Sequence, residues 1–122
     1  NFRKNVFKSK INLYSILKNI KNNNKKICGI GAPARASTLI NYIGLDENII
    51  DYVVEIKDSK KIGNYIPGTK IPILPEKKLF TDQPDFAMIF SWHIASELKK
   101  KLRQKGFKGK FIIPLPTPSV EK

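Results

Sequence analysis

Apolar residues along this chain follow two alternating kinds of spacing. In residues 5–21 they recur every three or four positions, which predicts an amphipathic helix that ends in an Asn-rich turn. Shorter apolar runs rich in Ile, Val and Phe predict strands. The expected strands cover residues 26–30, 49–55, 71–74, 85–91 and 110–114. Helical spacing returns at residues 34–42, 75–80 and 95–104.

This order of elements predicts the fold class. Alternating strands and helices are typical of a mostly parallel sheet with helices on both faces, so we expect an α/β, Rossmann-like domain of three layers. The strands at residues 26–30 and 85–91 are expected to be neighbours at the point where the strand order reverses. The prolines around residues 71–74 favour an edge strand there. The long segment 57–69 before it is expected to be a functional loop.

Length and composition limit the class of protein. A chain of 122 residues corresponds to one domain, and its hydrophobic share of 41% is that of a soluble globular protein. No apolar run reaches the roughly 20 residues that a membrane span needs, and the basic N-terminal stretch has no apolar core of a signal peptide. The single cysteine, Cys28, excludes an intramolecular disulfide and a zinc site built from cysteines. We therefore expect a cytoplasmic protein without a membrane partner.

The net charge of +13 raises nucleic acid as a partner, but its distribution does not favour one. The basic residues concentrate in residues 1–26, which contain no acid, and in residues 99–110. Both blocks lie in or beside expected helices, where outward lysines are usually solvated. No recognised nucleic-acid motif accompanies them, so we do not expect nucleic acid to be a partner.

Residues 29–35, Gly-Ile-Gly-Ala-Pro-Ala-Arg, stand between an expected strand and an expected helix. Their spacing fits the G-x-G-x-x-G/A arrangement, in which Gly29 permits the turn, Gly31 admits a ligand to the backbone, and Ala34 allows close packing. Pro33 suits the first helical position, where free N–H groups favour an anion. The turn predicts a phosphate or nucleotide site; a tight connection without a ligand has the same spacing.

Ligands of such sheets bind beyond the carboxyl ends of the strands, which nominates further residues. Glu55 ends the second strand 24 residues after Gly31, where a Rossmann acid meets a ribose hydroxyl; a solvated carboxylate is the alternative. Trp92 and His93 follow the fourth strand, with core packing and a helix-start hydrogen bond as their alternatives. Arg35 offers a fork suited to phosphate oxygens, and a salt bridge to Glu55 or Asp58 is its alternative.

Five segments keep the order and spacing of a known family. They are residues 29–42, 50–55, 67–73, 84–85 and 91–93. Across about residues 25–116 the chain resembles the C-terminal domain of S-adenosylmethionine-dependent sugar C-methyltransferases. The resemblance implies an enzyme that methylates a carbon of a nucleotide-linked keto-deoxy sugar, with zinc in an N-terminal region and S-adenosylmethionine in a central domain.

For this chain the resemblance implies a fragment of such an enzyme that helps to hold the sugar nucleotide and closes one side of the active site. We expect an N-terminal helix and connection in residues 1–24 and the Rossmann-like domain in residues 25–122. The implied substrate-binding residues are Gly29, Gly31, Ala32, Pro33, Arg35, Glu55, Trp92 and His93. No catalytic residue, metal or cofactor is expected here, and some relatives carry Asn in place of His93. The expected partners are the nucleotide-linked deoxy sugar and the remaining domains of the enzyme.

Two other functions stay open. A free-standing nucleotide or nicotinamide-binding module of the same fold would bind NAD tightly as an isolated chain. A basic adaptor for nucleic acid or acidic proteins would show an affinity that falls steeply with salt and does not depend on the glycine turn.

Overall fold

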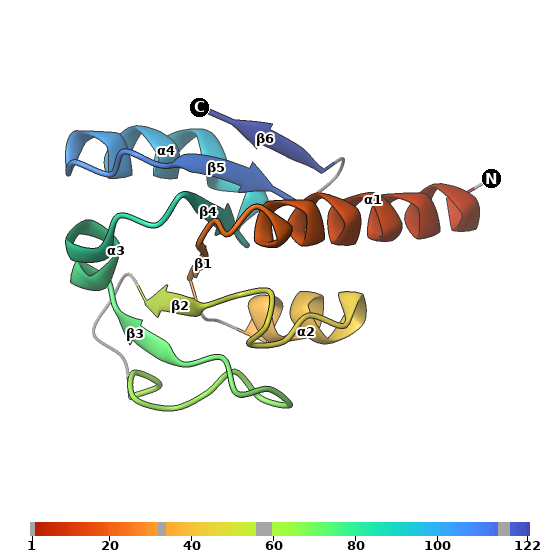
Figure 1. The fold of residues 1–122 in the computed structure, drawn as a ribbon, viewed down its shortest axis with the longest axis horizontal. Helices are drawn as coiled ribbons and strands as arrows, with labels where there is room; N and C mark the ends of the chain where they lie inside the picture. Colours follow the sequence, from red (N-terminus) through yellow and green to blue (C-terminus); the bar gives the residue numbers. More distant parts are fainter. Residues whose placement is uncertain (1, 32–33, 56–59, 115–117) are drawn as a thin grey trace.

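The computed structural model describes residues 2–31, 34–55, 60–114 and 118–122, without the side chains of residues 2–9 and 34–36. Figure 1 shows the course of the chain. The elements in chain order are α1 (Phe2–Asn22), β1 (Ile27–Ile30), α2 (Ala34–Ile43), β2 (Tyr52–Glu55), β3 (Ile73–Pro75), α3 (Lys77–Asp82), β4 (Phe86–Ile89), the 3-10 turn η1 (Trp92–Ile94), α4 (Ala95–Gln104), β5 (Lys110–Ile113) and β6 (Ser119–Glu121).

The described strands form one sheet in the order β3-β2-β1-β4-β5-β6. The pairs from β3 across to β5 are parallel, and β6 runs antiparallel along the edge of β5. In β1, Cys28 lies opposite Tyr52 of β2 on one side and Ala87 of β4 on the other. This topology confirms the predicted Rossmann-like, mostly parallel sheet and the adjacency of the strands expected at residues 26–30 and 85–91.

Besides small shifts at the ends of other elements, three details differ from the pattern-based expectations. The second strand begins at Tyr52 rather than at residue 49, because the N–H groups of Ile49 and Ile50 both donate to the carbonyl of Asp46 and close a turn. Both isoleucines are nevertheless buried. The apolar run therefore predicted their burial correctly, but it wrongly predicted that they belong to the strand. The edge strand was expected and is confirmed as β3, although it starts at Ile73. β6 was not expected, because three residues with a single apolar side chain carry no strand pattern.

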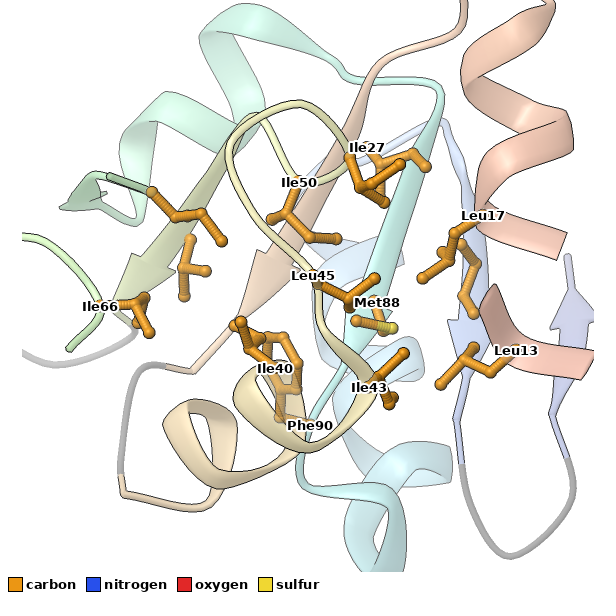
Figure 2. Packing of buried hydrophobic residues seen from close by; sticks show 14 of the residues in the cluster. Leu13, Leu17, Ile27, Ile40, Ile43, Leu45, Ile50, Ile66, Met88 and Phe90 are labelled. Atoms are coloured by element: carbon orange, nitrogen blue, oxygen red, sulfur yellow. The ribbon is translucent and has the colours of Figure 1, made fainter. Parts of the chain in front are cut away.

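Helices cover both faces of the sheet, as predicted. One buried cluster joins α1 and α2 to the sheet and includes Leu17 of α1, Ile40 of α2 and Met88 of β4 (Figure 2). The cluster on the other face joins α3 and α4 to the sheet through Leu79 and Leu102. The middle strands alternate between these clusters residue by residue, as strands buried on both sides must.

α1 is part of this core along its C-terminal half. Leu13, Leu17 and Ile20 are buried on the sheet, while the N-terminal turns of the helix extend past the other elements in Figure 1. No helix in the described part of the chain is both long enough and apolar enough to cross a membrane, and this includes α1 with its 21 residues.

Carboxylates fasten the edge of the sheet at which the parallel strands begin. Asp51, just before β2, accepts hydrogen bonds from the Lys21 ammonium at 2.8 Å and from the Ile27 N–H at 2.9 Å. Asp85, just before β4, accepts the Lys26 N–H at 2.8 Å. The amino edge of the sheet is therefore held by charge-assisted bonds that join α1, β1, β2 and β4.

A third carboxylate, Asp82 at the end of α3, belongs to the same edge. It accepts the Tyr52 hydroxyl at 2.7 Å and the Lys26 ammonium at 3.0 Å. Burial by itself raises the pKa of Asp82, but the hydrogen bonds from Tyr52 and Lys26 outweigh it and lower that pKa below its ordinary value of 3.8. A lowered pKa means that the ionised carboxylate stabilises the fold above pH 3.8 and that this contribution disappears as pH falls through the lowered value.

We expect Tyr52→Phe to reduce the free energy of unfolding by about 1–2 kcal/mol at pH 7, because the ring stays packed and the charged hydrogen bond is lost. The difference between the variant and the parent should be smaller at about pH 3 than at pH 7, because the pH then approaches the lowered pKa of Asp82 and the carboxylate begins to lose its charge. Urea unfolding at the two pH values measures both effects.

Tyr65→Phe is the matched control for this substitution, since the Tyr65 side chain is 60% exposed and the change removes the same hydroxyl. Its unfolding free energy should stay within about 0.5 kcal/mol of the parent at both pH values. An equal loss for Tyr52→Phe at pH 7 and pH 3 would show that the hydroxyl does not act through the Asp82 charge.

Candidate functional site at the carboxyl edge of the sheet

The strand order reverses between β1 and β4. The chain leaves β1 through α2 on one face of the sheet and leaves β4 through η1 and α4 on the other face. The two connections therefore diverge beyond the carboxyl ends of these neighbouring strands. In open α/β sheets this is where ligands bind.

Gly31 makes the turn out of β1. Its φ of 84° lies in the left-handed region, where a residue with a side chain is strained. Its N–H donates to the carbonyl of Val54 at 2.8 Å, which ties the turn to the end of β2. α2 then starts at Ala34, with Arg35 in its first turn. Ala32, Pro33, the side chain of Arg35 and its alternative partner Asp58 lie outside the described part of the chain.

The prediction that Gly29 provides the turn is wrong. Gly29 lies inside β1, buried, and it is the ring of Phe90 that occupies the space beside it. A Cβ at this position would lie 2.4 Å from Phe90 Cε2 and 3.1 Å from Val53 Cγ2. The glycine is required because Phe90, the first residue after β4, packs across the neighbouring strand.

Glu55 and the pair Trp92 and His93 end the flanking strands. Glu55 is the last residue of β2, half-buried, and directly follows Val54, the residue bonded to Gly31. Trp92 is half-buried and His93 exposed in η1, and their rings meet edge to face with centroids 6.1 Å apart. Glu55, Trp92 and His93 each already have an interaction within the protein. The fold thus brings Gly31 and Glu55 together on adjacent strand ends and places Trp92 and His93 after the strand on the other side of β1.

Two supporting residues were missed by sequence reasoning. The alternation of side chains along a strand could have identified Phe90. It lies two residues after Met88 and therefore on the same face of the sheet, where Gly29 has no side chain. The other is Asn41, whose side-chain amide donates to the Pro67 carbonyl at 3.0 Å and so fastens the loop before β3 onto α2. No pattern in the sequence pairs two residues that are 26 positions apart.

The loop that Asn41 holds has hydrogen bonds of its own. The Ile66 N–H donates to the Ile71 carbonyl, and the Thr69 hydroxyl donates to the Ile66 carbonyl and accepts the Ile71 N–H. Gly68 has a φ of +81°, and a Cβ there would lie 2.8 Å from Asn41 Oδ1. The expected loop is thus ordered where it is described, from residue 60 onward, and it abuts the helix that starts at the glycine turn.

Comparisons with known proteins agree with this architecture. The family described as "C-methyltransferase C-terminal domain" matches residues 1–116. The chain is 31% identical over 99 residues to a protein named "C-methyltransferase NovU" from Streptomyces niveus. That match covers 79% of this chain and 23% of the relative, so the chain spans about a quarter of the length of NovU.

We expect Gly29→Ala to reduce the free energy of unfolding by about 1–3 kcal/mol, because a methyl group must displace the buried Phe90 ring. Replacing glycine within a strand by alanine otherwise stabilises by roughly 0.5–1 kcal/mol, so the sign of the change shows whether the Phe90 contact dominates. Denaturant unfolding of the 122-residue chain measures it.

Phe90→Leu provides the companion variant. The shorter side chain leaves room for the new methyl group, so the two substitutions together should cost less than the sum of their separate losses. Additive losses, or a gain in stability for Gly29→Ala alone, would contradict the packing role of Gly29.

Proposed function

Since the chain belongs to the family of C-methyltransferase C-terminal domains, we propose that it is the part of a methyltransferase that holds a nucleotide-linked keto-deoxy sugar and closes one side of the active site. The observation that carries this proposal is the carboxyl edge of the sheet. There the left-handed turn at Gly31, the start of α2 and the end of β2 meet beside the point where the strand order reverses.

In this proposal the pyrophosphate of the sugar nucleotide is bound by Gly31 and by the next two residues of the sequence, Ala32 and Pro33. Backbone N–H groups at the start of a helix bind anions, and Arg35 in the first turn of α2 adds a guanidinium suited to phosphate oxygens. Glu55 at the adjacent strand end is placed to accept a hydrogen bond from a ribose hydroxyl.

Trp92 and His93 form the opposite wall of the proposed site. They stand after β4, across β1 from Glu55, where an indole and an imidazole edge can contact a sugar or base ring. Gly29 contributes through the core by allowing Phe90 to hold the end of β4 against β1. We assign no catalytic residue to this chain.

The chemistry proposed for the whole enzyme needs further groups. Transfer of a methyl group to carbon requires a base for the proton beside the keto group and hydrogen-bond donors for the enolate charge. We propose that S-adenosylmethionine, which supplies the methyl group, is bound by a central domain and that the reaction occurs where that domain faces this one. This placement and the proposed sugar nucleotide also imply a cytoplasmic enzyme.

Cys28, the single cysteine of this chain, does not fit a zinc site. Burial raises the pKa of the Cys28 thiol well above its usual range, and the adjacent negative charges of Asp82 and Asp51 raise it further. Metals bind the thiolate, so a thiol that stays protonated in the core is not a ligand. Any zinc site of the enzyme is therefore proposed for the N-terminal region outside this chain.

We expect Arg35→Ala, made in the full-length enzyme, to weaken sugar-nucleotide binding by about 1.5–3 kcal/mol, because a charge-assisted hydrogen bond to phosphate is lost. Gly31→Val should weaken it more, since valine is strained at φ 84° and its side chain fills the approach to the backbone. The Michaelis constant for the sugar nucleotide and the melting temperature of each variant are the two measurements.

Two further variants separate geometry from charge. Arg35→Lys keeps the charge and loses the planar fork, so it should fall between the parent and Arg35→Ala. Lys101→Ala removes an exposed cation from α4 and should leave the Michaelis constant unchanged. If Arg35→Ala melts like the parent and its Michaelis constant stays within about twofold, Arg35 does not bind phosphate.

We expect isothermal titration calorimetry of the 122-residue chain with S-adenosylmethionine to show no binding at sub-millimolar concentration, because the proposal places that site in another domain. A parallel titration with NAD tests the alternative that the same edge serves a free-standing dinucleotide-binding module. Saturable binding of S-adenosylmethionine would contradict the proposal that another domain binds it, and tight binding of NAD would favour the alternative.

A further inference from the structure

One face of the molecule carries apolar side chains that the core does not use. Six large apolar side chains are well exposed among the described residues, and three of them lie on α1 and α2. These are Ile11, Tyr14 and Tyr42, which are 48%, 37% and 50% exposed. The other three are dispersed over the loop before β3, η1 and β6.

The three residues form one continuous surface. Ile11 and Tyr14 are one helical turn apart, and Lys10 lies one turn before Tyr14 on the same helix. The Lys10 ammonium lies over the ring of Tyr42 at 4.7 Å from its centroid, so α1 and α2 touch at this point. We call Lys10, Ile11, Tyr14 and Tyr42 the α1–α2 face.

α1 therefore has two apolar sides. Leu13, Leu17 and Ile20 bury one side against the sheet, and Ile11 and Tyr14 present the other side outward. A surface helix that only covers a sheet needs one apolar stripe, with polar residues opposite. A second stripe on a helix whose N-terminal turns extend past the other elements (Figure 1) is typical of a helix packed between two bodies.

The charge around the α1–α2 face limits which kind of surface can pack against it. Residues 1–26 contain eight basic residues and no acid. Two of them, Lys10 and the exposed Lys18, each lie one helical turn from Tyr14, so the α1–α2 face has positive charge beside it. Two copies of this chain joined symmetrically through the same face would bring these basic helices together, which electrostatic repulsion disfavours. A fitting occupant is apolar at its centre and acidic at its rim.

The comparisons supply a candidate of sufficient size. The family model describes a C-terminal domain and includes α1, and more than three quarters of NovU lies outside the region that this chain matches. A domain that belongs to a larger enzyme packs against another part of it, and the interfaces between domains of one chain are partly apolar surfaces of this kind.

We propose that the α1–α2 face is the docking surface for the part of the methyltransferase that precedes this domain, which contributes an apolar patch with an acidic rim. This inference rests on the proposed function in one respect, that the domain works as part of a larger enzyme. It places the contact on the helical face formed by α1 and α2 and leaves the carboxyl edge of the sheet free for substrate.

Hydroxyl-radical footprinting of the full-length polypeptide tests this directly, with Tyr65 as the internal control. In the domain itself the exposures of Tyr14 and Tyr65, 37% and 60%, differ less than twofold. Docking should make Tyr14 at least about fivefold less reactive than Tyr65, because interface cores exclude water. Reactivities that differ only about as much as the exposures would show an open face and overturn the proposal.

A pair of matched substitutions identifies the occupant. Ile11→Glu places a charge in the proposed interface and should raise Tyr14 reactivity at least about threefold in the full-length polypeptide. Val120→Glu, on β6 at 43% exposure, makes the same change outside it and should not. Sedimentation shows whether the polypeptide forms a dimer. If Tyr14 is protected only at concentrations at which a dimer is present, the occupant is a second copy and the proposal is wrong.

The same preparations distinguish this inference from the proposed function. Tyr14 protection is measured without substrate, whereas the phosphate site is tested by the Michaelis constant of Arg35→Ala. If Tyr14 is protected and the Michaelis constant of Arg35→Ala equals that of the parent, the docking surface stands and the phosphate site is wrong. If Tyr14 is unprotected and the Michaelis constant of Arg35→Ala rises, the phosphate site stands and the docking surface is wrong.

Discussion

The contact between Phe90 and Gly29 is the constraint on which the carboxyl edge of the sheet depends. The ring takes the place of a side chain on β1, so the chain leaving β4 is held across its neighbour before it turns into η1. Close packing in a core leaves no alternative position for so large a ring. Trp92 and His93 owe their place to this contact, although neither takes part in it.

The two edges of the sheet have different physical roles. At the amino edge, Asp51, Asp82 and Asp85 bind backbone N–H groups, ammonium groups and the Tyr52 hydroxyl, and these bonds fix how the strands begin. At the carboxyl edge the turn at Gly31 is tied to β2 by a backbone bond. The described hydrogen bonds of these carboxylates thus lie at the edge of the sheet opposite the proposed site.

α1 links the fold to the proposed assembly. Its inner side is part of the larger core cluster, and Lys21 ties its last turn to Asp51, so the helix is rigidly attached to the sheet. A rigid helix with a second apolar side can hold a neighbouring domain in a fixed orientation. In the proposed enzyme this would set how the methyl donor faces the sugar, because the relative position of two domains is fixed by the interface between them.

The sequence by itself determined the fold class, the adjacency of β1 and β4, and the edge position of β3. Apolar periodicity, the order of the elements and the prolines around β3 are local features that can be read along the chain. The sequence also located the glycine turn, since Gly31 has the positive φ that favours glycine. Only the tertiary structure decided which glycine serves the core, that β6 joins the sheet, and that Asn41 holds the loop. Each of these depends on a partner distant in sequence, such as Phe90 for Gly29 or Pro67 for Asn41, and no local pattern encodes such a pairing.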